Sequence, residues 1–287
     1  MDLFDRSIFD LINSRARQIE NTLKADVVFY NGRIHPAYFR AFRDFVEEVK
    51  KKSARNDDAI AVFIRTGGGS AETAERMVAV LRKHYKQIYF VVPDIAMSAG
   101  TILCMAGDKI YMDYASSLGP IDPQIPTPDT GDYVPALGYL DKVKEITEKG
   151  DLAPADVVLL KSLDLAKLAL FEQARDLSTD LLKEWLVKYK FKDWIKHRTT
   201  NKGAKVTINE KRARAKEIAD ALANHKMWRS HGRNLDLVKL KTLRIEIDDY
   251  SDKKELCRLI REYNDPLTGF IDRLEIPVFL HSHHIPH

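Results

Sequence analysis

Short and almost continuously apolar runs constrain the fold of this chain more than any other feature. They are Asp26 to Tyr30 (DVVFY), Ala59 to Ile64 (AIAVFI) and Ile88 to Val92 (IYFVV), and Ile110 to Met112 continues the series. A strand that is apolar on both faces belongs to a sheet covered on both sides, which is typical of parallel sheets. Segments with helical spacing separate the runs, so the sequence predicts βαβ units and an α/β fold with a mostly parallel sheet.

The helices expected around this sheet have apolar residues at helical spacing. They cover Phe4 to Leu23, Pro36 to Lys51, Ala71 to His84, Pro154 to about Lys190, and Lys253 to Tyr263. Five prolines predict an irregular loop from Pro120 to Pro135, and the run LRIEI at 243–247 is strand-like. We therefore expect a core over residues 1–200 and a smaller C-terminal α/β extension, rich in helix, over residues 201–280.

The last seven residues, 281–287, form a His-rich tail (HSHHIPH) that we expect to be disordered. Such a tail could capture nickel or zinc adventitiously, but we expect no metal and no cofactor in the function. Cys104 and Cys257 lie far apart and have no CxxC partner, which suits a reducing compartment and excludes a Cys-rich zinc module.

Composition excludes several classes of function. The net charge of +4 is modest and no motif for reading DNA or RNA accompanies it, so we expect no nucleic-acid partner. No apolar run approaches the roughly 18 residues of a membrane span, and the N-terminus has no secretory signal, so we expect a cytoplasmic protein without an integral membrane segment. For the first helix, peripheral membrane contact through Phe4, Ile8 and Leu11 is the alternative to packing in the core.

The first candidate for chemistry is Arg65 to Ser70 (RTGGGS), where an apolar strand meets a helix. Three glycines let the backbone approach a ligand closely, and the helix N-terminus offers free N–H groups. Neither the phosphate-loop pattern nor the dinucleotide fingerprint is present. The segment is therefore either a ligand-binding turn or simply a tight turn with Ser70 as the helix N-cap.

The second candidate is Asp94 to Met105 (DIAMSAGTILCM), which follows the next strand. Ser98 lies among small residues at the start of a helix, where backbone N–H groups can hold an oxyanion. The alternative is that Ser98 only caps the helix. Turns after neighbouring parallel strands open at the same carboxyl edge of the sheet, where ligands of α/β proteins bind.

Together, IRTGGGSAETAERM and VVPDIAMSAGTILCMAGDKIYMDYASSLGPIDPQI resemble the Clp-fold serine peptidases of the crotonase-like superfamily. The most similar family is the SDH-type serine dehydrogenase proteinase family, which is related to signal peptide peptidase A and the Clp proteolytic subunit. The resemblance covers roughly residues 25–190 and a later stretch, Trp228 to Arg233 (WRSHGR). It implies a Clp-type fold, a peptide or protein substrate and assembly into homo-oligomers. It also implies Ser98 as nucleophile and an oxyanion hole formed by Gly68, Gly69 and the N–H of Ala99.

The general base is left open between two residues. Asp122 and Pro123 stand where the Clp proteolytic subunit has its His, which excludes a triad in that arrangement. Lys167 falls in an apolar helical stripe, where desolvation lowers the pKa of a lysine; the alternative is that it reaches the surface or pairs with Asp164. His231, in WRSHGR, is the rival base, although a lone His is more often structural.

Two other functions remain as alternatives to a serine peptidase. The first is a non-catalytic Clp-fold protein that binds peptides or scaffolds a partner. The second is a crotonase-like acyl-CoA enzyme, which would use the same kind of oxyanion hole with a Glu base and no serine at position 98.

Overall fold

A six-stranded sheet forms the centre of the computed structural model, which describes residues 3–56, 58–126, 133–161, 164–199 and 201–285. The strand order is β10-β1-β2-β3-β5-β9, and every neighbouring pair is parallel except β10 and β1. The strands are β1 (Asp26–Gly32), β2 (Ala59–Arg65), β3 (Gln87–Val92), β5 (Lys109–Met112), β9 (Asp248–Asp249) and β10 (Val278–His281). The predicted α/β fold with a mostly parallel sheet is confirmed.

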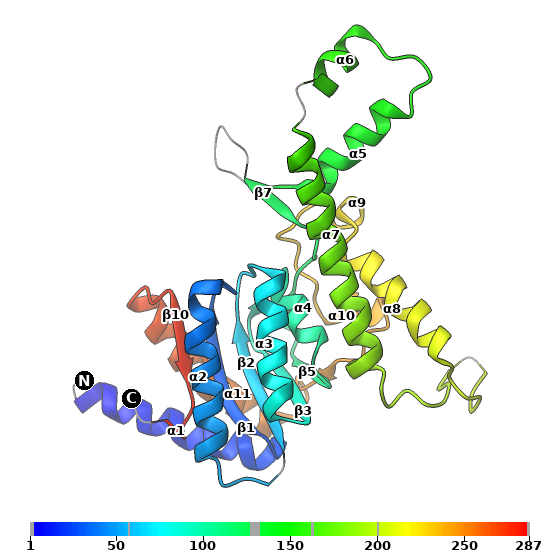
Figure 1. Ribbon diagram of the computed structural model, residues 1–287. Helices are drawn as coiled ribbons and strands as arrows, with labels where there is room; N and C mark the ends of the chain where they lie inside the picture. Colours follow the sequence, from blue (N-terminus) through cyan, green and yellow to red (C-terminus); the bar gives the residue numbers. More distant parts are fainter. Residues whose placement is uncertain (1–2, 57, 127–132, 162–163, 200, 286–287) are drawn as a thin grey trace.

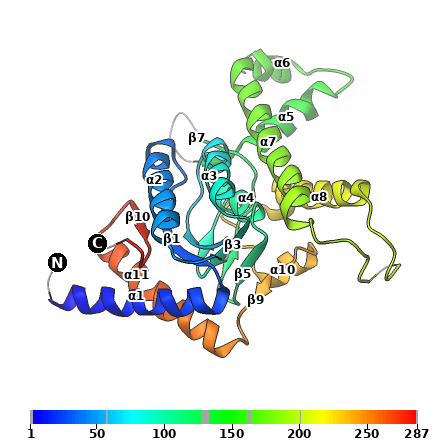
Figure 2. The ribbon, with the colours of Figure 1, turned by 60° about the horizontal axis from the view of Figure 1, so that its bottom comes forward.

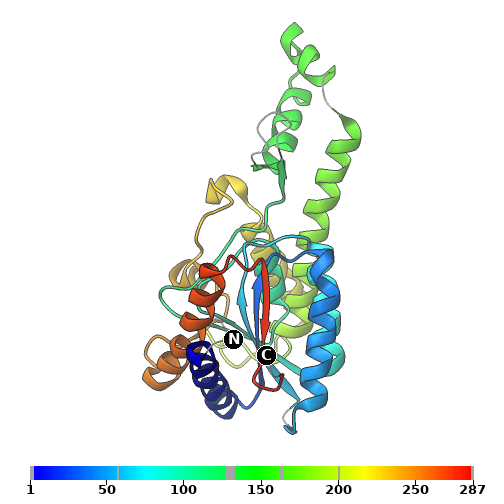
Figure 3. The ribbon, with the colours of Figure 1, turned by 90° about the vertical axis from the view of Figure 1, so that its left-hand side faces the viewer.

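Helices cover both faces of this sheet, as Figure 3 shows with the strands seen between them. Val27 and Phe29 of β1 point into one core, whereas Val28 and Tyr30 point into the other. The first core is closed by α1 (Leu3–Leu23) and α11 (Lys254–Arg273). The second is closed by α2 (Pro36–Lys52), α3 (Ala71–His84), α4 (Ala99–Met105), the end of α7 (Leu165–Trp185) and α8 (Ile208–Leu222).

An arm projects from this body, formed by α5 (Ala136–Thr147), α6 (Pro154–Lys161) and the first part of α7 (Figure 1). The sequence predicted one helix from Pro154 to about Lys190, but the structure has α6, α7 and a π-helical turn over Leu186–Lys190. The Asp164 carboxylate accepts the N–H of Ala166 at 3.0 Å and so starts a new helix.

Short elements complete the fold, and the structure differs from the expectation in two short segments. They are β4 (Ile95–Ala96), β6 (Ser117–Leu118), β7 (Gln124–Pro126), β8 (Tyr133–Pro135), α9 (His225–Trp228) and α10 (Leu237–Thr242). The predicted loop from Pro120 to Pro135 contains the antiparallel pair β7–β8, and residues 127–132 lie outside the described part. The strand-like run at 243–247 is not a strand; β9 begins just after it.

The chain after β10 lies beside α1, as Figure 2 shows. The tail expected to be disordered from residue 281 is ordered through residue 285, because His281 ends β10 and is fully buried against Tyr263. Ile8 of α1 packs on the core and Leu11 is 44% exposed, while the Phe4 side chain lies outside the described part. Among the described helices, none has the length and apolar character needed to cross a bilayer.

Replacing Phe63 by Ala should lower the free energy of unfolding by about 3–5 kcal/mol. Phe63 of β2 is fully buried, and its ring packs edge-on against Tyr263 with the ring centroids 4.9 Å apart. Urea denaturation followed by far-UV circular dichroism measures the loss. Phe63→Leu keeps most of the buried volume and should cost clearly less; equal losses in the two variants would contradict this packing.

Candidate active site

The glycine turn after β2 is held between two neighbouring segments. Thr66 pairs with β4, since its N–H donates to Ile95 O and its C=O accepts from Met97 N, each at 3.0 Å. On the other side, Ile34 N donates to Gly68 O and Ser70 N donates to Ile34 O, each at 2.9 Å. The turn is therefore fixed on both sides.

Within this turn the backbone N–H groups point in different directions. The N–H of Gly68 donates to Thr66 Oγ1 at 3.0 Å. Gly69 is bridged to Ile34 through its neighbours, so its own N–H points away from Ile34. Ser70 caps α3 as expected, because its hydroxyl accepts the N–H of Thr73 at 2.9 Å.

Ser98 stands between β4 and α4 in an unusual backbone conformation. Its φ of 51° and ψ of −116° are rare for a residue with a side chain. Its hydroxyl makes no capping hydrogen bond to α4, so the alternative that Ser98 only caps this helix fails. The side chain is half-buried, and the N–H of Ala99 opens the helix, where N–H groups have no intrahelical acceptor.

The two turns touch one another directly. A Cβ atom on Gly68 would come within 2.8 Å of Ser98 Cβ, and one on Gly100 would come within 2.5 Å of Thr66 Cγ2. The glycine turn and Ser98 therefore share one site at the carboxyl edge of the sheet, as the sequence predicted.

A third segment, the loop after β6, carries a buried carboxylate to the same edge. β6 pairs in parallel with β4, just before Ser98, and Gly119 N donates to Thr101 Oγ1 of α4 at 3.0 Å. Ile121 N then donates to Leu222 O at 3.1 Å. The next residue, Asp122, is only 1% exposed.

The C-terminal region brings His231 to this carboxylate. Leu118 and Leu235 exchange backbone hydrogen bonds of 3.1 and 2.8 Å, which places the segment after α9 beside β6. His231 Nδ1 lies 3.0 Å from Asp122 Oδ1, while Gln124 Nε2 donates to Asp122 Oδ2 at 2.8 Å. An ionised carboxylate only accepts hydrogen bonds, so Nδ1 carries the proton and Nε2 is left as the basic nitrogen.

The structure joins the Ser98 turn to β6, and β6 to the segment that carries His231, but it does not describe the side chain of Lys167. Lys167 is the third residue of α7, in the part of that helix that belongs to the projecting arm (Figure 1). Its role as base stays a prediction. The reasoning from sequence missed Asp122 as a partner of His231, although Asp122 lies within the motif SSLGPIDPQ that carried the resemblance.

Gly69→Ala should lower the free energy of unfolding by about 2–4 kcal/mol. Gly69 has a φ of 148°, and a Cβ atom there would meet Ile34 O at 2.1 Å. Gly67 is the matched control, because a Cβ on it meets nothing within 4 Å. The free energy of unfolding of Gly67→Ala should lie within about 0.5 kcal/mol of that of wild type. Thermal and urea melts test both, and a fully stable Gly69→Ala would contradict the described turn.

Comparison with known proteins places this chain in a family. The model of the ClpP-like SDH-type serine proteinases matches residues 43–210, which is more than half of the chain. Two proteins of Methanocaldococcus jannaschii, both described as uncharacterized, are 39% and 38% identical over 74 and 69 residues. These matches span about a quarter of this chain and about a quarter of the length of either relative.

Solved structures of the 1510-N membrane-bound stomatin-specific protease are similar as well. A serine-to-alanine mutant is 16% identical with a TM-score of 0.47, over 81% of this chain and 82% of that one. A lysine-to-alanine mutant in complex with a substrate peptide is 17% identical with a TM-score of 0.46, over 80% and 76%. On the match of the family model, the chain belongs to the ClpP-like SDH-type serine proteinases.

Proposed function

We propose that this protein is a serine peptidase in which Ser98 is the nucleophile, His231 the general base and Asp122 the residue that orients the base. The observation that carries the proposal is the 3.0 Å hydrogen bond between His231 Nδ1 and buried Asp122, on a loop bonded to the Ser98 turn. Membership of a serine proteinase family supports it.

In the proposed reaction, Ser98 Oγ attacks the carbonyl carbon of a peptide bond while His231 Nε2 accepts the hydroxyl proton. Asp122 holds the imidazole in the Nδ1–H tautomer and stabilises the imidazolium that forms. His231 then gives the proton to the departing amine. Water, activated by the same nitrogen, hydrolyses the acyl ester and restores Ser98.

The oxyanion hole is proposed to consist of the N–H groups of Gly69 and Ala99. The N–H of Gly68, which the sequence also offered, already donates to Thr66 Oγ1. Gly68 contributes instead by having no side chain, since a Cβ there would collide with Met97 O and Ser98 Cβ, each at 2.8 Å. An oxyanion donor typically contributes on the order of 10²–10³ in rate.

The proposed triad has the same three residue types as that of the Clp proteolytic subunit, but its Asp and His come from different segments of the chain. The loop position of the His in the Clp proteolytic subunit holds Asp122 here, and the His comes from the C-terminal region. The chain order Ser, Asp, His is the one found in α/β-hydrolases, an unrelated fold, so the geometry rather than the order defines the chemistry.

We also propose that the projecting arm mediates homo-oligomer assembly. Leu152, Val158 and Leu170 of the arm are 45%, 67% and 61% exposed. Apolar side chains gathered on one exposed segment are typical of protein–protein contacts. The substrate is proposed to be a peptide or protein.

Labelling with a fluorophosphonate probe tests the nucleophile and the base together. Wild type should be labelled and Ser98→Ala should not, because only an activated serine reacts. His231→Ala should label at least about 10²-fold more slowly, since proton transfer is lost, whereas Lys167→Ala should label like wild type. The reverse result for these two variants would make Lys167 the base. A folded wild type that does not label would favour a peptide-binding or scaffolding protein.

Asp122→Asn should lower kcat by about 10²–10⁴ while leaving the fold intact. The amide would donate a hydrogen bond to Nδ1 and so favour the tautomer whose Nε2 carries the proton and cannot act as a base. Turnover of a fluorogenic peptide measures this effect. The matched control is His225→Ala, because His225 pairs with Asp141 at 3.3 Å in the same C-terminal region but outside the proposed triad. An unchanged rate in Asp122→Asn would contradict the triad.

A further inference from the structure

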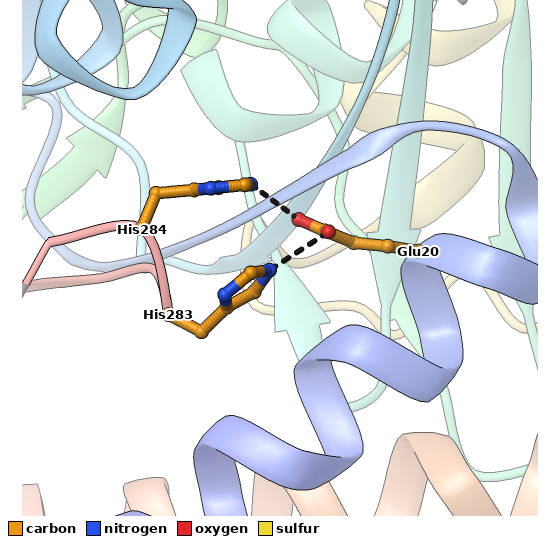
Figure 4. A group of neighbouring side chains, drawn as sticks. All are labelled: Glu20, His283 and His284. Carbon is orange, nitrogen blue, oxygen red and sulfur yellow. Dashed lines mark hydrogen bonds and ion pairs between the residues drawn. The ribbon is translucent and has the colours of Figure 1, made fainter. Parts of the chain in front are cut away.

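Two histidines of the C-terminal tail converge on one buried carboxylate, far from the site described above. After β10 the chain turns over α1, and His283 Nε2 and His284 Nε2 reach the two oxygens of Glu20 at 2.8 and 3.0 Å (Figure 4). The Glu20 side chain is 5% exposed and the two imidazoles are 12% and 11% exposed. The three groups therefore form a compact cluster that is mostly withdrawn from solvent.

A second carboxylate borders this cluster. Asp26 Oδ1, at the start of β1, lies 3.8 Å from His284 Nε2, and Asp26 is 2% exposed. Its two oxygens accept hydrogen bonds from Ser53 Oγ at 2.5 Å and Tyr85 Oη at 2.9 Å. Four potential ligands, two nitrogens and two carboxylates, thus come from three separate segments of the chain.

The orientation of Glu20 is fixed independently of the histidines. The backbone N–H of Val27 donates to Glu20 Oε1 at 2.8 Å. Burial by itself would raise the pKa of Glu20, but the hydrogen bonds from His283, His284 and Val27 N–H lower it to about 2. The Glu20 carboxylate is therefore held from behind by a backbone donor, as the ligands of protein metal sites usually are.

The spacing of these atoms fits a tetrahedral metal ion. The ligand atoms of Glu20, His283 and His284 all lie within 4.8 Å of one another. Bond lengths of about 2.0–2.1 Å at tetrahedral angles require ligand atoms roughly 3.3 Å apart. The contacts of 2.8 and 3.0 Å to Glu20 are slightly shorter than that, and the 3.8 Å contact to Asp26 is slightly longer. Small side-chain shifts would bring these three contacts to the required spacing.

The total charge of the four ligands also matches a divalent cation. Two neutral imidazoles, the Glu20 carboxylate and the Asp26 carboxylate carry a total charge of −2, which one divalent ion neutralises. A set of nitrogen and oxygen ligands without thiolates suits zinc, cobalt or nickel better than calcium or magnesium, which prefer oxygen alone.

We propose that His283, His284 and Glu20 form a zinc site, with Asp26 or a water molecule as the fourth ligand. The site is structural, because it lies at the opposite end of the sheet from Ser98. Asp26 is the first residue of β1, whose seven residues span roughly 20 Å, whereas Ser98 follows the carboxyl ends of the neighbouring strands. The ion ties the tail after the edge strand β10 to α1 and to the start of β1.

Titration of chelator-treated protein with Co²⁺ and Zn²⁺ tests this site without reference to peptidase activity. We expect one Co²⁺ per chain with the intense visible absorption of a tetrahedral complex, its displacement by Zn²⁺, and a rise in melting temperature with either ion. Binding should weaken as the pH falls, because protons compete with the metal for the imidazoles.

Glu20→Gln is the decisive variant, because it leaves every histidine in place and keeps an oxygen for the N–H of Val27. It should weaken Co²⁺ binding at least tenfold, and His284→Ala should do the same. His197→Ala is the matched control, since His197 contacts the carboxylate of Glu210 at 3.0 Å elsewhere on the molecule, and it should bind Co²⁺ like wild type.

Three outcomes would overturn the proposal. Equal Co²⁺ affinity in Glu20→Gln and wild type would mean that the tail histidines capture metal on their own. An octahedral spectrum would mean a solvated surface complex. Absence of stoichiometric binding would leave the cluster as ion pairs between histidines and Glu20. Serine labelling is a separate readout, so none of these results bears on the triad.

Discussion

Burial of the parallel sheet on both faces is the constraint on which the rest of this structure depends. Because β1, β2 and β3 are apolar on both sides, helices must cover both faces, and only the two ends of the strands remain open for polar groups. The carboxyl ends hold the glycine turn, Ser98 and the pair formed by His231 and Asp122. The amino end of β1 and the end of α1 hold the cluster around Glu20.

The parts that could be predicted from sequence are those determined by neighbouring residues. The apolar runs located β1, β2 and β3 to within two residues, and the caps and periodicity located α2 and α3 equally well. The glycine turn and the Ser98 turn could be expected at one edge because consecutive parallel strands place their connections there. The close approach of Gly68 to Ser98 agrees with this expectation.

The parts that could not be predicted depend on contacts between distant segments. Asp122 and His231 are 109 residues apart, and they meet because Leu235 pairs with Leu118 at the end of β6 and Ile121 bonds to Leu222. No local pattern indicates that pairing. Likewise, a polar tail such as HSHHIPH is expected to be disordered until Tyr263 and Glu20 are seen beside it. The break in the helix after Pro154 depends on Asp164, which the periodicity alone does not reveal.

The backbone at Ser98 has a consequence for how this protein balances stability against function. A non-glycine residue with a φ of 51° costs on the order of 1–3 kcal/mol relative to a relaxed conformation. That free energy must be supplied by the surrounding packing of α4, the glycine turn and β6, so the serine is held where an unconstrained chain would not place it. A glycine at position 98 would relieve the strain and remove the hydroxyl at once. The most stable version of this fold is therefore one that lacks the serine proposed as its nucleophile.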